Sequence, residues 1–138
     1  MFTQKFDRFV CEGDTIETER DGFTITARIV HDPDSGIDDD DCHNPDQSVT
    51  GCDDEQHEAL MSAREAWLND EWFYCGIILD VSRNGVPVET HAASLWGIEA
   101  NYPGSDNSYL TEVANELLDE ALEFASKSRD KIIEALSA

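Results

Sequence analysis

The sequence predicts an α+β fold, in which a mostly antiparallel four-stranded sheet has helices packed on one face. Two pairs of segments alternate apolar and polar residues, and each pair is joined by a turn dipeptide, Asp21-Gly22 or Asn84-Gly85. Each pair is followed by a segment with apolar residues at helical spacing. The expected order is therefore hairpin, helix, hairpin, helix, and residues 1–138 are expected to form a single domain.

The first hairpin is expected to join strands over Asp14–Arg20 and Phe23–His31. Apolar residues recur at every second position in both segments, as on the buried face of a half-exposed strand. Asp-Gly suits the turn between them, because both central residues of a tight hairpin turn need positive φ. Phe6–Val10 is expected to add a short edge strand.

A long acidic loop is expected after this hairpin, at about residues 32–53. The chain carries eleven acidic residues from the end of the hairpin to Glu58, with no Lys or Arg and no hydrophobic period. Loops of this length are usually either functional or disordered, and the sequence leaves both open. A helix is then expected to begin near Asp53, which forms a capping-box pattern with Gln56, and to run to about Asn69.

The second hairpin is expected to supply the central strand of the sheet. Residues 72–81 are a nearly continuous run of aromatic, apolar and β-branched residues, typical of a strand covered on both faces. Residues 86–98 return, and Pro87 indicates an edge position, since proline cannot donate to the strand ladder. Ser108 is expected to cap a long helix that runs toward Leu136.

Charge limits the classes of partner. The chain has 31 acidic and nine basic residues, a formal net charge of −22. Such a surface repels nucleic acid and anionic membranes, and it attracts basic protein surfaces and metal cations. We therefore expect no direct nucleic-acid partner and no membrane. The longest apolar run is too short to span a bilayer and the first residues lack a signal-peptide core, so a cytoplasmic location with reduced cysteines is expected.

Five carboxylates share one face of the expected last helix, opposite an apolar stripe. The five are Glu112, Glu116, Asp119, Glu120 and Glu123, and the stripe is Leu110, Val113, Ala114, Leu117, Ala121 and Phe124. At ~1.5 Å per residue the five span about 17 Å, a charge density comparable to one DNA strand with a phosphate about every 3.4 Å. No Lys or Arg lies between positions 84 and 126 to relieve the repulsion. The face indicates either a mimic of the phosphate backbone or a solvated surface adapted for solubility or salt.

A metal site is the alternative that the acidic loop raises. Residues 32–41 offer oxygen ligands, but Gly36 falls at the fifth position of an EF-hand register and His43 at the twelfth, where that motif has Gly at the sixth and Glu at the twelfth. Zinc accepts the residue types of the four weak candidate ligands, but their spacing lacks the usual C-x2-C pair. These candidates are Cys42, His43, Cys52 and His57. No cofactor is expected, although a loop ordered by Zn²⁺ or Ca²⁺ would make the chain a metal-binding interaction module.

Catalytic motifs are scarce, and an enzyme is not expected. The chain has no G-x-S-x-G sequence and no glycine-rich phosphate loop. His91 and Ser94 lie on an expected strand, where alternation would point them to opposite faces.

The segment Phe73–Leu122 resembles uncharacterised small acidic proteins of bacteriophages, plasmids and other mobile elements. The similarity is carried by Ala93–Glu99 (ASLWGIE) and Tyr102–Ser105 (YPGS). It implies a mobile-element context and no catalytic residues. Small acidic proteins of such elements often inhibit host defence, and several anti-restriction and anti-CRISPR families resemble DNA in charge.

These observations favour a non-enzymatic DNA-mimic inhibitor that blocks the basic surface of a host restriction or CRISPR complex or of a DNA-binding protein. The expected contact residues are the five carboxylates of the last helix, together with Asp38, Asp39, Asp40 and Asp41 of the loop. The expected partner is a basic host protein or nucleoprotein complex, and a homodimer stays open.

Overall fold

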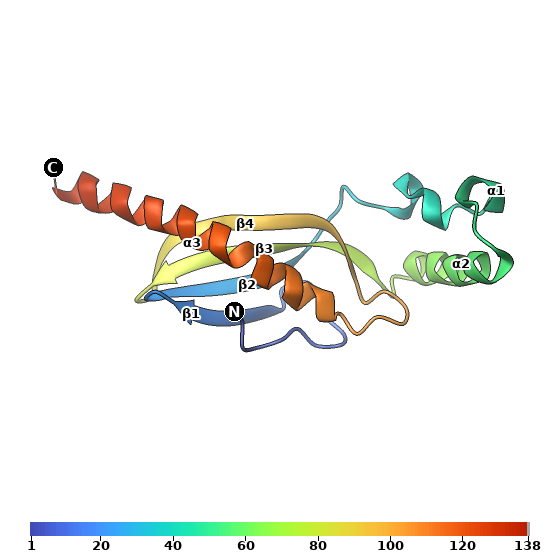
Figure 1. The fold of residues 1–138 in the computed structure, drawn as a ribbon, viewed down its shortest axis with the longest axis horizontal. Helices are drawn as coiled ribbons and strands as arrows, with labels where there is room; N and C mark the ends of the chain where they lie inside the picture. Colours follow the sequence, from blue (N-terminus) through green and yellow to red (C-terminus); the bar gives the residue numbers. More distant parts are fainter. Residues whose placement is uncertain (138) are drawn as a thin grey trace.

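A computed structural model describes residues 1–137, apart from the side chain of Asp39, and confirms the α+β fold class (Figure 1). The elements in chain order are β1 (Thr15–Arg20), β2 (Phe23–His31), η1 (Ile37–Asp39), η2 (Asp41–His43), α1 (Gln47–Thr50), α2 (Asp54–Leu68), β3 (Phe73–Arg83), β4 (Val86–Ala100) and α3 (Ser108–Ser137). The four strands form one antiparallel sheet in the order β1-β2-β3-β4. The η elements are single turns of 3-10 helix.

Both expected hairpin turns are confirmed. Asp21 and Gly22 have φ of 55° and 81°, and Asn84 and Gly85 have φ of 52° and 79°. These left-handed conformations cost glycine nothing and asparagine or aspartate little, which is why the sequence places them there. The register that follows pairs Arg20 with Phe23 in the first hairpin and places the apolar residues of both strands on one face.

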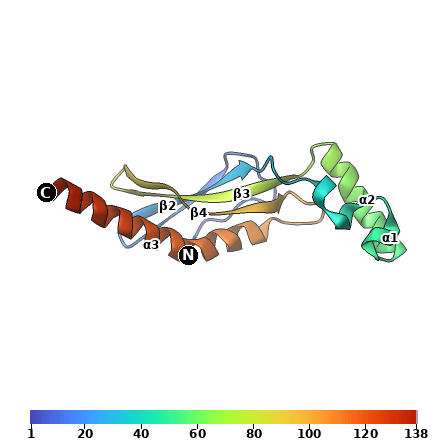
Figure 2. The same cartoon turned by 90° about the horizontal axis from the view of Figure 1, so that it is seen from above.

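One helix, α3, covers the sheet, and this differs from the expectation that both long helices pack on it. Figure 2 shows α3 running along one face. The core between them is built from alternate residues of the strands, including Ile25, Ile77 and Leu79, and from Leu110 and Leu118 of α3. The helix α2 instead lies beyond one end of the sheet (Figure 1). Ala66 and Trp67 of α2 pack there against a separate small core that includes Trp72, and not against the main core under α3.

The N-terminal segment is not an edge strand, so that expectation is wrong. Phe2, Phe6 and Val10 are buried in the main core, but the backbone between them forms no ladder. Its amides bond to side chains instead: the Phe6 amide donates to Thr111 Oγ1 at 3.0 Å, and the Val10 amide donates to Asn101 Oδ1 at 2.8 Å. The segment is thus held by apolar anchors and by side-chain acceptors near the start of α3.

The face of the sheet opposite α3 carries a tryptophan laid against a glycine. A Cβ built on Gly76 of β3 would come within 2.4 Å of Cε3 of Trp96 in β4, so the indole occupies the space of the missing side chain. The strand pairing shifts register at this point, between Cys75 and Ile77, and Gly97 has φ of 73°. This irregularity turns the Trp96 ring onto the sheet while leaving it half exposed.

Residues 37–68, which we call the distal lobe, pack around a second and smaller core at the far end of the sheet. Its buried members are Ile37 of η1 together with Trp72 and Tyr74 at the start of β3. The indole nitrogen of Trp72 donates to the Ala63 carbonyl at 2.7 Å and so ties α2 to the sheet. The capping box is confirmed: Asp53 accepts from the Gln56 amide at 2.8 Å, and the Gln56 side chain accepts from the Asp53 amide at 3.1 Å.

Candidate functional site

The acidic face of α3 points to solvent along its whole length. All five carboxylates are exposed, and they are Glu112, Glu116, Asp119, Glu120 and Glu123. The opposite stripe is buried, but its register is rotated from the expected one: Leu118, Leu122 and Ala125 are buried, whereas Phe124 is 50% exposed. The core therefore fixes α3 by its apolar side and leaves the carboxylates free to meet a partner.

Few cations reach this face. Arg20 Nη1 lies 3.2 Å from Asp119 Oδ1, and Lys127 Nζ lies 3.2 Å from Glu123 Oε1. Both pairs are exposed to water, where such a pair contributes about 0–1 kcal/mol and is weakened further by salt. The other three carboxylates form no ion pair with any described residue.

Glu112, at the start of α3, is closest to the basic part of the N-terminal segment. It lines a hollow of about 590 Å³ with Lys5 and Arg8. Basic side chains therefore lie near both ends of the face, Lys5 and Arg8 at its start and Lys127 beside Glu123.

The acidic loop is more ordered than the sequence indicates. The region expected as an irregular loop contains η1, η2 and α1, and side-chain acceptors cap the last two: Asp40 accepts from the Cys42 amide at 2.8 Å and Asp46 from the Ser48 amide at 3.0 Å. Of the expected contact residues, Asp38 and Asp41 are exposed, whereas Asp40 turns inward. The side chain of Asp39 lies outside the part of the chain that the structure describes.

Asp40 belongs to a buried polar network that sequence reasoning missed. Its Oδ2 lies 2.7 Å from Nδ1 of His43 and accepts from the hydroxyl of Tyr74 at 3.1 Å. The other ring nitrogen of His43 lies 2.9 Å from the hydroxyl of Tyr102. Tyr102 follows β4 and is 59 residues from His43, so only the fold brings the two together. The sequence offers one hint, the spacing of Asp40 and His43 by three positions, which a single helical turn brings together.

The network surrounds the Asp40 carboxylate with hydrogen-bonding groups from three parts of the chain. Burial alone would raise the pKa of Asp40, but the bonds from the Cys42 amide, His43 and Tyr74 outweigh it and hold that pKa below its usual value. Burial raises the pKa of the Tyr74 and Tyr102 hydroxyls, helped by the charge of Asp40. Hydroxyls that stay protonated donate hydrogen bonds and are poor nucleophiles. The arrangement therefore orders the loop rather than activating a reacting group.

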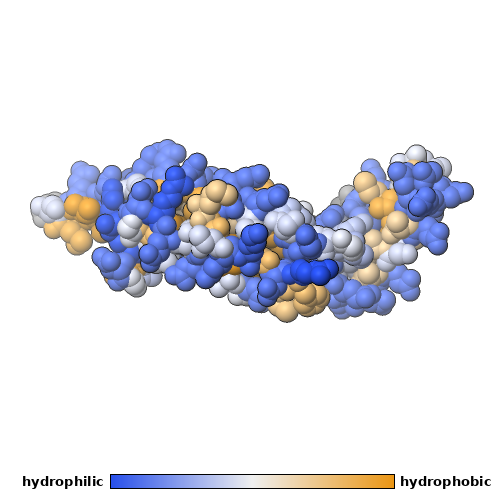
Figure 3. All heavy atoms as spheres, turned by 60° about the horizontal axis from the view of Figure 1, so that its bottom comes forward, coloured by the Kyte–Doolittle hydropathy of each residue, from blue (hydrophilic) through white to orange (hydrophobic). Residues whose placement is uncertain are grey.

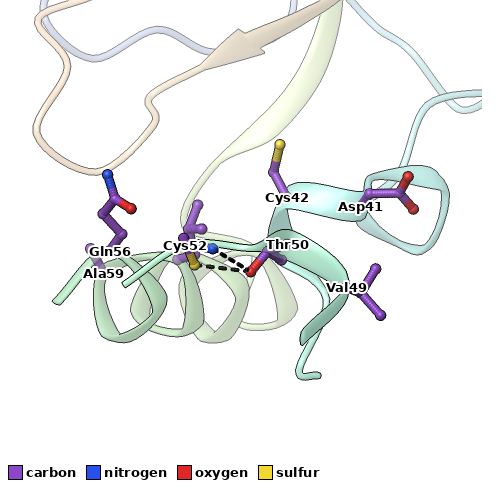
Figure 4. Close-up of a pocket in the computed structure, with 8 residues that line it drawn as sticks. Asp41, Cys42, Val49, Thr50, Cys52, Gln56 and Ala59 are labelled. Carbon is purple, nitrogen blue, oxygen red and sulfur yellow. Dashed lines mark hydrogen bonds between the residues drawn. The ribbon is translucent and has the colours of Figure 1, made fainter. Parts of the chain in front are cut away.

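The four zinc candidates do not converge. His43 is committed to the network, and Cys52 Sγ lies 2.9 Å from Thr50 Oγ1. Figure 4 shows Cys42 pointing away from this pair, although Cys42 and Cys52 both line a largely apolar groove of about 470 Å³ between η2, α1 and α2. His57 is half-buried at the start of α2. Within residues 1–137, no group of three or more His, Cys, Asp or Glu side chains is placed to hold a metal ion.

Asp32, the first acidic residue of the segment compared with an EF-hand loop, already accepts hydrogen bonds from the protein itself. Asp32 is buried, and its carboxylate accepts from the Asp34 amide at 3.0 Å, the Ser35 hydroxyl at 2.9 Å and the Gly97 amide at 2.9 Å. Burial alone would raise the pKa of Asp32, but these bonds outweigh it and lower that pKa. Asp32 therefore ties the end of β2 to the irregular part of β4.

His91 and Ser94 lie together, so the expectation that they point to opposite faces is wrong. Nε2 of His91 is 2.8 Å from Oγ of Ser94, because His91 has φ of 60° and interrupts the alternation of β4. The pair lacks the rest of a catalytic site: Asp80 accepts from the backbone amide of His91 at 2.8 Å rather than from its ring, and its other oxygen is 2.7 Å from Arg28 Nε. The imidazole is exposed, and no carboxylate of the described residues is hydrogen-bonded to its ring.

Comparisons with known proteins found no match for the chain. No family model, no curated protein and no solved structure matches the chain. Within residues 1–137, no helix combines the length and the apolar character needed to cross a bilayer.

Proposed function

We propose that this protein is a non-enzymatic DNA-mimic inhibitor from a mobile element, acting in the host cytoplasm. It occupies the basic nucleic-acid-binding surface of a host restriction or CRISPR complex, or of another host DNA-binding protein. The observation that supports this proposal is the exposed row of carboxylates on α3, a rigid helix anchored by its opposite side. A basic groove that binds phosphates at regular intervals would meet carboxylates at a comparable interval.

The placement of the charge supports mimicry more than solubility. A face adapted only for solubility gains from mixing lysines with glutamates, which also stabilises the helix by about 0.2–0.5 kcal/mol per pair. The middle of α3 gives up that stabilisation at Glu116, Asp119 and Glu120, and within residues 1–137 the one ion pair of these carboxylates joins Asp119 to Arg20 of β1. Away from α3, the side chains of Asp32, Asp40 and His43 form hydrogen bonds that hold loops in place.

Neutralising the middle of the face is the most direct experiment. The triple variant Glu116→Gln, Asp119→Asn, Glu120→Gln keeps the shape of each side chain and removes three charges. We expect binding to a captured host protein to weaken by about ten-fold or more, because each lost contact to Lys or Arg of the target costs a fraction of a kcal/mol or more. The measurement is retention of bacterial lysate proteins on the immobilised chain at low salt, with binding constants for each recovered protein.

A matched control removes the same charge from a different helix. The variant Glu55→Gln, Glu58→Gln, Glu65→Gln lies on the exposed side of α2 and changes the net charge equally. Elution with short double-stranded DNA, compared with polyglutamate of equal charge, reports whether the captured surface is a DNA site. Equal weakening by the two variants, or equal elution by the two polymers, would show that the interaction is non-specific and that the proposal is wrong.

A further inference from the structure

The two hairpin turns, Asp21-Gly22 and Asn84-Gly85, lie at the same end of the sheet and line one hollow of about 590 Å³. Each turn joins a side chain that ends in a carbonyl carbon to a glycine. In such a pair the glycine nitrogen can attack that carbon, because glycine has no Cβ to obstruct the approach. The surroundings of the two turns differ, and the difference decides which of them is free to react.

Arg83 covers the first turn. Its Nη1 donates to the Asp21 carbonyl at 3.1 Å, and a Cβ built on Gly22 would come within 2.7 Å of the same nitrogen. The guanidinium also lies 5.2 Å from the ring centre of Phe23, which holds the side chain across the turn. The Asp21-Gly22 turn is therefore clamped and shielded.

The reacting atoms of the second turn are free. Asn84 and Gly85 are both exposed, and a Cβ built on Gly85 would meet nothing within 4 Å. Within residues 1–137, neither the Asn84 side chain nor the Gly85 amide forms a hydrogen bond. Both the electrophile and the nucleophile of the reaction are thus unoccupied.

The tip of this hairpin is also weakly held. Only two regular pairs, Ser82 with Pro87 and Arg83 with Val86, separate the turn from the first register shift of the ladder. Val86 is 63% exposed, and Figure 3 shows a mostly hydrophilic surface over this part of the molecule. The Gly85 nitrogen reaches Cγ of Asn84 only when the chain leaves the left-handed turn, and a tip without apolar anchors opens at low cost in free energy.

The other asparagines are hindered in the same reaction. Three of them hold hydrogen bonds to distant parts of the chain through their side chains: Asn101, Asn107 and Asn115. Asn44 precedes a proline, whose nitrogen carries no hydrogen to lose, and Asn69 precedes an aspartate, whose side chain obstructs the approach. Asn84 is thus the asparagine with the fewest obstacles.

We propose that Asn84 is a site at which this chain modifies itself by loss of ammonia. The Gly85 nitrogen forms a bond to Cγ of Asn84, the bond from Cγ to Nδ2 breaks, and the proton of the Gly85 amide leaves with Nδ2 as ammonia. Water then opens the cyclic imide at either carbonyl. Aspartate results when the new bond breaks, and isoaspartate results when the original peptide bond breaks. The reaction needs no oxidant and no cofactor, and the proposal is independent of the function proposed above.

The modification is expected to loosen both turns. Either product adds a negative charge beside the hollow that the two turns share. Isoaspartate also carries the backbone through an additional methylene group, so the two-residue turn no longer fits the pairing of Arg83 with Val86. Because Arg83 clamps Asp21, a shift of Arg83 releases the first turn as well.

Incubation of the whole protein at mildly alkaline pH, followed by mass spectrometry of its proteolytic peptides, tests the proposal. We expect the peptide that contains Asn84 to gain the mass of an amide-to-acid change at least about ten-fold faster than peptides with the other asparagines, because those must first break contacts. Electron-transfer fragmentation separates aspartate from isoaspartate, and both should accumulate at position 84. A free peptide of residues 80–89 sets the time over which the reaction is followed.

Two variants serve as controls. Asn84→Gln keeps the amide but requires a larger and less favourable ring, so it should abolish the fast gain of mass. Asn69→Gln changes another exposed asparagine and should leave the rate at Asn84 unchanged. A chain that stays unmodified while the free peptide reacts, a first gain of mass at another asparagine, or an equally fast gain in Asn84→Gln would overturn the proposal.

Discussion

The body of the molecule and the distal lobe are both acidic, yet different interactions hold them. In the body, α3 is anchored by a large apolar core that includes Leu110, Leu118 and residues of all four strands. In the lobe, the apolar core has three buried members, and the turns are fixed largely by carboxylate acceptors and by the network around His43. The difference shows that an apolar core holds α3 in the body, whereas in the lobe an ionised carboxylate is a larger part of what maintains the fold.

The largest loss of stability is expected from a substitution in the apolar core of the body. Leu118→Ala removes a side chain that is 1% exposed beneath the acidic face. Lost burial and the remaining cavity should lower the free energy of unfolding by about 2–5 kcal/mol. Urea unfolding followed by far-UV circular dichroism measures this, with the exposed Leu68→Ala as a control that should change stability by no more than about 0.5 kcal/mol. A small loss for Leu118→Ala would mean that the apolar core does not anchor α3.

Asp40→Asn is expected to cause a smaller loss of stability that is confined to the lobe. The amide has a single acceptor oxygen and cannot replace all three hydrogen bonds of the carboxylate, and hydrogen bonds to a charged group each contribute about 1.5–3 kcal/mol. We expect faster amide hydrogen exchange over residues 41–68, with exchange in the sheet unchanged. Asp38→Asn, at an exposed neighbouring position, is the matched control and should leave the lobe protected.

The same carboxyl predicts how the lobe responds to acid. The folded pKa of Asp40 lies below the unfolded value of about 3.8, because the bonds from Cys42, His43 and Tyr74 outweigh the effect of burial. Its stabilising contribution is therefore fully present above the unfolded pKa and is lost as pH falls through the folded pKa. Protection of the lobe amides, taken as the exchange rate relative to that of the unfolded chain at the same pH, should fall between about pH 4 and pH 2 in wild type, and this fall should be smaller in Asp40→Asn. An identical acid response in both proteins would exclude Asp40 as its source.

The smallest loss of stability is expected from removing the N-cap of α2. Asp53→Ala removes the acceptor for the Gln56 amide and breaks the capping box, at a cost of about 0.5–2 kcal/mol. Exchange of the Gln56 and His57 amides should increase first, because they lie in the turn that the cap closes. Glu55→Ala changes charge in the same turn without touching the cap, so it should give a clearly smaller increase. Equal increases would assign the effect to helix charge rather than to capping.

The features predicted correctly from sequence are those set by neighbouring residues. Asp21-Gly22 and Asn84-Gly85 specify their turns, because the conformations that these residues tolerate are local properties. The Asp53–Gln56 capping box is likewise contained within four positions. The acidic face of α3 follows from helical spacing alone, and its exposure in the structure agrees with that spacing, whereas its role as a binding surface stays a prediction.

The features that sequence missed depend on distant contacts. The inward turn of Asp40 depends on Tyr74 and Tyr102, which lie 34 and 62 positions along the chain and carry no motif. Burial of Leu118 rather than Phe124 depends on how α3 is rotated against the sheet, which several adjacent apolar residues would allow. Ser94 meets His91 only because positive φ interrupts β4, and an unbroken strand was the natural expectation.

The position of Trp96 against Gly76 gives the protein a built-in optical reporter. Trp96 is half exposed on the open face of the sheet, whereas Trp72 is buried at the base of the lobe and Trp67 lies beside it in the same small core. An indole in water emits at longer wavelength than a buried one, so the two environments are separable in one emission spectrum. Quenching by a dissolved quencher would report the sheet surface first, and a red shift of the protected component would report opening of the lobe, without any label attached to the chain.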